Sequence, residues 1–387
     1  MKIRKDKVSN WKIENIGKFA TIGRGSSPRP ITDKRFFENG TIPWIKIADA
    51  TAAGRIIYKT KEYVNEYGAS FSRLLKKGSL ILSASGVSLG IPRFLGVDGC
   101  IHDGWLYLEN IHDIDVDFLY YKLLTLRTYF DNLSYGAAIQ NINTDIFSKT
   151  KISLPPLPTQ QKIASILSAY DNLIQDYKKQ IEVLQTAASE LYKEWFVRFR
   201  FPGYQTARFE NGIPEGWKVV LASELGDFIR GKNITAEEMQ EGTIPVISAG
   251  IEPSGFHNQS NVKGVSLTIS NSGANAGYLQ INYSDIWAAD CSYCNSAKHI
   301  YFYYELLNNM RVVLFNLQKG AAQPHVYAKD INKMKILLPP SELIETADKK
   351  IKLMHEKIYS LEQQITNLTQ QRDLLLPRLM SGKLEVE

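Results

Sequence analysis

Two motifs, Gly136-Ala137-Ala138 and Leu154-Pro155-Pro156, are separated by fifteen residues. They return with the same spacing as Gly320-Ala321-Ala322 and Leu338-Pro339-Pro340, at an offset of 184 residues. Each copy leads into a long segment with a helical pattern. A repeat of this length indicates duplicated domains rather than the short stacked units of a solenoid. We therefore expect two equivalent halves.

The duplication continues upstream of these motifs. Gly40-Thr41-Ile42-Pro43 returns as Gly242-Thr243-Ile244-Pro245, and the Ser-x-Ser-Gly loop ending at Gly86 returns as the loop ending at Gly273. An acid follows each loop, Asp103 in the first half and Asp290 in the second. The offset varies between patches, as loop insertions would make it. We expect the two halves to share one backbone framework and to carry different surfaces. The repeated glycines are expected to meet a requirement of backbone conformation before any contact with a ligand.

Composition is typical of a globular protein, with 387 residues, 44% apolar and 22% charged. The sequence contains no run of eighteen apolar residues of the kind that spans a membrane. We expect a cytoplasmic protein without a membrane partner. Three cysteines are too few for a disulfide framework. Cys291 and Cys294, with His299 nearby, resemble half of a zinc site, but a second ligand pair is missing, which favours buried thiols and no metal.

The net charge of +6 is unevenly distributed. Residues 1–157 hold 22 basic and 15 acidic side chains, whereas residues 200–340 hold 12 of each. A basic globular half suggests a polyanionic partner, although such a balance also serves solubility alone.

Each globular half reads as a strand-rich α+β domain. Strands are expected at 42–47, 79–83 and 105–108 in the first half and at 244–247, 266–270 and 300–303 in the second, with helices at 117–133 and 304–317. The expected domains are a first recognition head at 1–157, a central spacer helix at 158–199, a second head at 200–340, a C-terminal spacer helix at 341–381 and a tail at 382–387.

A heptad pattern free of Pro and Gly begins at Ile163 and predicts a long helix in a left-handed coiled coil. Its seam residues are Ile163, Leu167, Tyr170, Ile174, Tyr177, Ile181, Leu184, Ala188, Leu191 and Trp195. The pattern returns after the second head at Ile344, Ala347, Ile351, Met354, Ile358, Leu361, Ile365, Leu368, Arg372, Leu375 and Leu379. Only Arg372 interrupts the second seam.

The two helices are expected to form an antiparallel pair with one head at each end, so that two unlike heads would meet an asymmetric, bipartite DNA site. Apolar residues beside the seams widen the stripe: Ile166, Leu173, Leu374 and Leu376. A wide stripe favours packing by helices of other subunits. The alternative is that the extra width faces the chain's own heads.

Motifs for catalysis are incomplete. Residues 226–233 have phosphate-loop spacing up to Lys232, but Asn233 replaces the hydroxyl residue that would hold magnesium. The histidines form no metal-spaced cluster, and Leu precedes each Pro-Pro pair where an adenine methyltransferase would need Asn or Asp. We expect no catalysis by this chain alone and no cofactor bound to it.

The glycine-bearing loops of the heads contain the side chains that contact phosphates and base edges. The candidates for DNA binding are Arg24, Arg29, Lys34, Arg35, Lys46, Ser85, Arg93, Gln140 and Asn141 in the first head, and Arg230, Lys232, Lys263, Asn271, Asn275, Tyr278, Lys319, Gln323 and His325 in the second. Taken singly, each also fits a solvated surface position.

Nearly the whole chain resembles the DNA-specificity subunit of type I restriction-modification systems. The Gly-Ala-Ala segments, the stretch 154–163, the Ser-x-Ser-Gly loops and the order head, helix, head, helix carry this resemblance. It implies two target-recognition domains that each read half of a split site in the major groove of double-stranded DNA. It also implies an antiparallel helical spacer that binds two methyltransferase subunits, with restriction subunits in the full complex.

The resemblance assigns S-adenosylmethionine, ATP and magnesium to those partner subunits. Thr159, where such proteins often carry Glu, and the segment 341–343 depart from the family pattern, so the two helix starts need not dock partners identically. A different class of function also fits the residues, namely a non-catalytic coiled-coil scaffold whose heads bind protein or RNA. An orphan DNA-binding regulator without a methyltransferase is a third reading.

Overall fold

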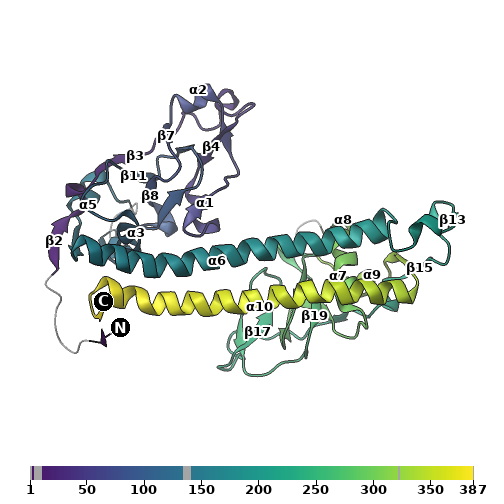
Figure 1. Cartoon of the computed structure of the whole chain (residues 1–387). Helices are drawn as coiled ribbons and strands as arrows, with labels where there is room; N and C mark the ends of the chain where they lie inside the picture. The colour runs from purple at the N-terminus through teal and green to yellow at the C-terminus, as the bar shows by residue number, and fades with distance from the viewer. Residues whose placement is uncertain (1, 4–10, 134–140, 321–322, 387) are drawn as a thin grey trace. The chain divides into compact units, whose positions relative to one another are not determined.

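The computed structural model describes residues 2–3, 11–133, 141–320 and 323–386. Two compact units divide the chain (Figure 1): residues 1–177 with 364–387 form unit 1, and residues 178–363 form unit 2. Each unit therefore combines a globular head with one part of each long helix. None of the helices in the described ranges is long and apolar enough to cross a membrane.

A five-stranded sheet forms the frame of the head in unit 1, in the order β3-β11-β8-β9-β5. Its strands are β3 (Thr21–Arg24), β11 (Trp105–Glu109), β8 (Leu80–Ser83), β9 (Pro92–Leu95) and β5 (Ile56–Ile57). β11 pairs antiparallel with both β3 and β8. Every residue of β8 is buried, so this central strand carries a continuous apolar run instead of an alternating pattern.

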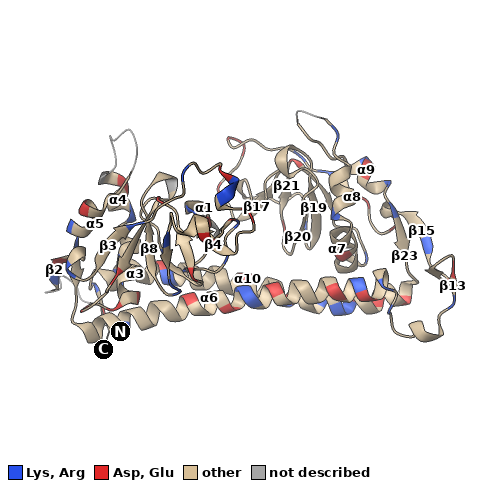
Figure 2. Ribbon diagram, turned by 90° about the horizontal axis from the view of Figure 1, so that it is seen from above, with Lys and Arg blue, Asp and Glu red and all other residues tan. Residues whose placement is uncertain are grey.

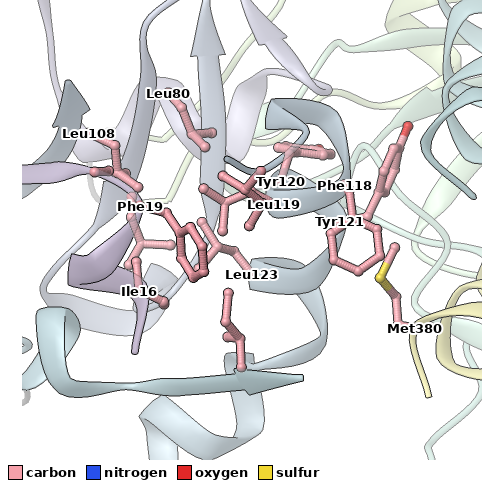
Figure 3. Close-up of a cluster of buried hydrophobic side chains, with 14 of the residues drawn as sticks. Ile16, Phe19, Leu80, Leu108, Phe118, Leu119, Tyr120, Tyr121, Leu123 and Met380 are labelled. Atoms are coloured by element: carbon pink, nitrogen blue, oxygen red, sulfur yellow. The ribbon is translucent and has the colours of Figure 1, made fainter. Parts of the chain in front are cut away.

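The core of this head lies between the sheet and helix α3 (Val116–Thr125). Figure 3 shows Phe118 and Leu123 of α3 in one cluster with Leu80 of β8, and Met380 beside Tyr121. Full burial of a side chain as large as Phe118 contributes roughly 2–3 kcal/mol. Met380 belongs to the second long helix, so the head and that helix share one core within unit 1.

A smaller sheet completes the first head in the order β6-β4-β10-β7. Its strands are β6 (Tyr63–Val64), β4 (Ile42–Ile45), β10 (Gly99–Ile101) and β7 (Arg73–Leu75). β4 and β10 run parallel, whereas the other pairs are antiparallel. Trp44 and Cys100 are fully buried in this sheet.

Unit 2 repeats this plan. Its larger sheet has the order β16-β22-β19-β20 and its smaller sheet the order β18-β17-β21. The strands are β16 (Ile229–Arg230), β22 (Cys291–Cys294), β19 (Ser266–Ser270), β20 (Leu279–Asn282), β18 (Gly255–His257), β17 (Ile244–Ile247) and β21 (Trp287–Ala288). β17 and β21 pair in parallel, as β4 and β10 do in the first head.

Equivalent pairings continue outside these sheets. β2 (Lys12–Asn15) pairs with β12 (Lys151–Leu154), and β15 (Lys218–Leu221) pairs in the same antiparallel manner with β23 (Lys335–Leu338). The duplicated fold predicted from the repeated motifs is therefore confirmed.

The repeated loops owe their glycines to the backbone. Gly86 and Gly273 begin the short 3-10 turns η3 (Gly86–Ser88) and η7 (Gly273–Asn275) at φ values of +74° and +75°. That left-handed conformation favours glycine at both positions. The expectation that these glycines serve the framework is consistent with this geometry.

The two long helices are α6 (Leu157–Tyr192), which continues as a short π-helical segment Lys193–Val197, and α10 (Ser341–Met380). Within unit 1, Ile163 and Leu167 near the start of α6 share a core with Leu379 near the end of α10. Within unit 2, Ala188 near the end of α6 shares a core with Ile344 near the start of α10. The helices are thus antiparallel in each unit.

The predicted seam is the buried side of both helices. On α6, Ile163, Leu167, Ile174, Ala188 and Trp195 are buried, and the other seam residues are half-buried. The seam of α10 behaves likewise. The heptad assignment is therefore confirmed along both helices.

The wider stripe divides into two kinds of residue. Ile166 and Leu376 pack against the core of unit 1, as the alternative reading of the stripe requires. Leu173 and Leu374 remain 38% and 66% exposed, so these two side chains are open to a further partner.

The prediction of a strand at residues 300–303 is wrong. This stretch is the first turn of helix α7 (Ile300–Asn309), and the preceding strand is β22. Ile-Tyr-Phe-Tyr has strong strand propensity, but here the stretch is buried in the core of unit 2, where packing outweighs propensity.

The helices expected at 117–133 and 304–317 are each interrupted. α3 and α4 (Arg127–Leu133) meet at Leu126, and α7 and α8 (Arg311–Asn316) meet at Met310. Both heads break the helix at the same place, which a pattern of apolar residues does not reveal.

Candidate nucleic-acid interface

Each head places an arginine at the end of an edge strand. Arg24 ends β3 and lies opposite Leu106 of β11, while Arg230 ends β16 and lies opposite Ser292 of β22. Leu106 and Ser292 in turn face equivalent positions of β8 and β19. Arg24 and Arg230 therefore occupy the same position in the two copies of the fold.

The repeated Ser-x-Ser-Gly loop lies beside this position in both heads. Ser85 forms an isolated bridge with Asn141 in the first head, and Ser272 forms one with His325 in the second. In each head, this bridge brings the segment after the Gly-Ala-Ala motif to the Ser-x-Ser-Gly loop, although the segment and the loop are far apart in sequence. We call these places strand-end site 1 and strand-end site 2.

Strand-end site 1 is a hydrogen-bonded cluster. Arg24 Nε donates to the carbonyl oxygen of Asp103 at 2.7 Å, and Arg24 Nη2 donates to Asn141 Oδ1 at 3.1 Å. The guanidinium of Arg29 pairs with the Asp103 carboxylate. Arg24 and Arg29 thus meet at one acid, and Asn141 joins this cluster through Arg24.

Strand-end site 2 has different chemistry on the same frame. Ser292 Oγ donates to Asn271 Oδ1 at 2.6 Å, and the hydroxyl of Ser272 donates to the carboxylate of Asp290. His325 stacks on Tyr327 with ring centroids 6.1 Å apart. Arg230, Asn271 and His325 line a pocket of about 40 Å³, which has room for a water or two but not for a base.

Three basic candidates of the first head are engaged within the protein. Arg93 donates to the carbonyl oxygen of Ala50 through Nε at 3.1 Å and Nη2 at 2.8 Å, and burial lowers the pKa of its guanidinium. Arg35 forks onto Asp33. Lys46 pairs with Glu62.

Lys46 Nζ lies 2.5 Å from Glu62 Oε1 and 4.8 Å from the ring centroid of Trp44. Lys34 is exposed at the start of the 3-10 turn Lys34–Phe36. Lys46 directly follows β4 of the smaller sheet, and neither Lys46 nor Lys34 belongs to strand-end site 1. Gln140 lies outside the described residues.

The remaining candidates of the second head are mostly exposed. Lys319 is joined to His325 by backbone hydrogen bonds, while its ammonium pairs with Asp330 at 2.7 Å. Lys232, Lys263, Tyr278 and Gln323 are exposed, and Asn275 is half-buried in η7. Lys319 therefore adjoins strand-end site 2, whereas Lys232 lies over Trp287 of the smaller sheet, 5.9 Å from its ring centroid.

Five contributors to these sites were missing from the sequence-based candidates: Asp103, Asp290, Ser272, Ser292 and Tyr327. The repetition of an acid after both Ser-x-Ser-Gly loops was the available signal for the two aspartates, and the repeated loop itself contains Ser272. Ser292 and Tyr327 become notable only when the strand register and the pairing of His325 bring them to strand-end site 2.

No group of three or more metal-ligating side chains occurs in the part of the chain that the structure describes. Cys291 and Cys294 are buried thiols, and burial raises the pKa of Cys291 to about 12. The phosphate-loop-like segment 226–233 contains β16, and its Phe228 backbone N–H donates to Asn332 Oδ1 at 2.9 Å.

The long helices carry mixed charge on their outer faces. Figure 2 shows basic and acidic positions interspersed over much of their length, and pairs such as Lys349 with Glu345 bridge adjacent turns at 2.9 Å. This pattern is typical of solvated helix faces. The heads, rather than the helices, therefore offer the sites suited to nucleic acid.

Comparison with known proteins decides between a scaffold and a DNA-reading protein. The family model described as the type I restriction modification DNA specificity domain matches residues 8–185 and again residues 214–370. The chain belongs to this family. It is a DNA specificity subunit of a type I restriction-modification system, and the scaffold reading is not supported.

Curated relatives span the whole chain. The MjaIX specificity subunit of Methanocaldococcus jannaschii is 27% identical and is matched over 100% of this chain and 95% of its own length. The HindI specificity subunit of Haemophilus influenzae is 21% identical over 97% of this chain and 100% of its own length. The crystal structure of an S subunit from M. genitalium has the same fold, with a TM-score of 0.64, 18% identity and coverage of 98% of this chain and 99% of that one.

The two matches to the specificity domain correspond to the two copies of the fold. Specificity subunits of type I systems are non-catalytic, in agreement with the incomplete catalytic motifs. The strand-end sites are the places where the repeated framework of such a subunit carries unlike side chains.

Proposed function

We propose that each head of this specificity subunit reads one half of an asymmetric, bipartite site in double-stranded DNA through its strand-end site. One observation carries the proposal. The two sites occupy the same strand register but present Arg24 and Asn141, with Arg29 joined to them through Asp103, in one head and Arg230 and His325, beside the buried Asn271, in the other. An equivalent place with different donors and acceptors suits the recognition of two different base sequences.

We further propose that the long helices set the distance between the half-sites and dock two methyltransferase subunits. The exposed Leu173 and Val183 on α6 and Leu353 and Leu374 on α10 support a docking role for the long helices. In the full complex, restriction subunits complete the assembly. S-adenosylmethionine, ATP and magnesium belong to these partners, and the proposed role requires a cytoplasmic location, where the DNA lies.

The function is tested by co-expressing the chain with the methyltransferase encoded in the same host and measuring DNA binding by the purified complex. Binding should be sequence-specific, and its affinity should fall with salt, because phosphate neutralisation releases counterions. A log-log salt slope near zero, or equal affinity for all sequences, would overturn the proposal. Full affinity of the chain purified alone would indicate an orphan regulator instead.

A further inference from the structure

Asp103 holds two arginines at once in the first head. Its backbone carbonyl accepts from Arg24 Nε at 2.7 Å, and its carboxylate pairs with the guanidinium of Arg29. Its backbone N–H donates to Ser27 Oγ at 3.2 Å, which ties the loop after β3 to the loop before β11. The two guanidiniums, which come from different segments, are thereby fixed relative to one another.

Both guanidiniums remain available to a ligand. Arg24 is exposed, and the Arg29 side chain is 66% exposed while its partner Asp103 is 34% exposed. A guanidinium offers five N–H donors in a planar fork. Among the described residues, Arg24 uses Nε and Nη2 and Arg29 uses Nη2, so each keeps donors for another group.

Such an arrangement suits guanine. Arginine recognises guanine by two parallel hydrogen bonds to O6 and N7 in the major groove, and this contact requires the plane of the fork to be oriented. A free arginine side chain loses rotamer freedom when it docks, whereas one already held by an acceptor loses less. The carboxylate of Asp103 would repel phosphate if it stood alone, but Arg29 neutralises it.

We infer that Asp103 is a positioning residue that orients Arg24 and Arg29 to read guanine, so that the half-site of the first head contains guanine. This inference rests on the proposed function and deepens it. It applies to one half-site only, because the carboxylate of Asp290 in the second head accepts from the hydroxyl of Ser272 rather than from an arginine in the described structure.

If the Arg29–Asp103 pair served only the stability of the fold, removing it would lower the melting temperature and leave base selection unchanged. The Arg29–Asp103 pair is largely exposed, and exposed ion pairs contribute little to stability. Removing its charge should therefore leave the melting temperature nearly unchanged while altering base selection.

The test measures binding of the assembled complex to DNA libraries that vary each position of the recognised site. Asp103→Asn keeps the backbone carbonyl that accepts from Arg24 but removes the carboxylate charge that holds Arg29. Discrimination for guanine in one half-site should therefore fall about 10-fold, within the roughly 5- to 150-fold that a well-made bidentate contact contributes. Arg24→Lys should give the same half-specific loss, because lysine keeps the charge but lacks the fork. Asp98→Asn, which removes an acid from an exposed pair with Lys76 in the same head, is the matched control and should leave discrimination intact.

Three outcomes would overturn the inference while leaving the proposed function standing. These are a first half-site without guanine, guanine discrimination that survives Asp103→Asn, and a loss that affects both half-sites equally. Lack of sequence-specific binding by the unaltered complex would instead overturn the proposed function, and the inference with it.

Discussion

Arg372 forms an ion pair with Asp171 across the two long helices of unit 1, with Nη1 and Oδ1 2.5 Å apart. Asp171 also accepts from the hydroxyl of Tyr121 at 2.6 Å, so the pair links α6, α10 and the core helix of the first head. Arg372, the charged residue of the second heptad seam, therefore has an ion-pair partner in the interface between the helices.

Replacing Arg372 by alanine should lower the free energy of unfolding by about 2 kcal/mol, because the variant leaves Asp171 without its cation in a largely buried place. The expected loss is smaller than for a fully buried pair because the Arg372 side chain is 25% exposed. Urea unfolding followed by circular dichroism measures the change. The exposed Arg378 on the same helix is the control, and its alanine variant should stay within about 0.5 kcal/mol of the unaltered chain. Equal effects of the two variants would refute the role of the pair.

Glu362 should make stability fall as the pH rises. Burial raises the pKa of its carboxyl, although the nearby His355 acts in the opposite direction. An acid with a raised pKa in the folded state favours folding below its unfolded pKa, and this contribution is lost as the pH rises through the folded value. Glu362→Gln should therefore raise the melting temperature at pH 8, with a difference that shrinks toward pH 4.

The exposed Glu356, which lies 3.7 Å from Lys352, provides the matched control. Its glutamine variant should show little change at either pH. If Glu362→Gln were destabilising at pH 8, or if its benefit grew in acid, burial would not be the dominant influence on this carboxyl.

The three cysteines should resist alkylation in the folded chain. All are buried, and the pKa of about 12 for Cys291 leaves almost no thiolate at pH 8. Labelling by iodoacetamide should be slow until urea unfolds the protein, and an added Ser165→Cys on the exposed face of α6 should label at once. Fast labelling of the folded chain would contradict the burial of the thiols. Release of one zinc ion per chain upon unfolding would restore the zinc hypothesis for Cys291 and Cys294.

Inserting four residues near Gln185 should lengthen the spacer between the half-sites. Gln185 is exposed within α6, and four residues add about 6 Å of helix, close to the rise of two base pairs. The same insertion at Gly212, in the turn between strands Phe209–Glu210 and Ile213–Pro214, is the control and should not change the spacer. The recognised motif, read from methylated DNA, decides the matter. An unchanged spacer after the helical insertion would show that α6 does not set it.

The sequence predicted the features that depend on periodicity and repetition. The seam from Ile163 to Trp195 and the duplicated domains are examples, because burial follows spacing directly. It failed at residues 300–303, where aromatic and β-branched residues suit a buried helix as well as a strand. It also could not separate Arg24 from Arg93, since only strand register shows that the first ends at an open site while the second turns inward to Ala50.

The most direct test of the central claim is a genome-wide map of N6-methyladenine in the host with this gene intact and deleted, under conditions where the methyltransferase is expressed. We predict that deletion removes methylation from one asymmetric motif made of two half-sites and a fixed spacer. Exchange of the first head for that of a relative should then change one half of the motif only. An identical map with and without the gene, or a head exchange that alters both halves, would contradict the account.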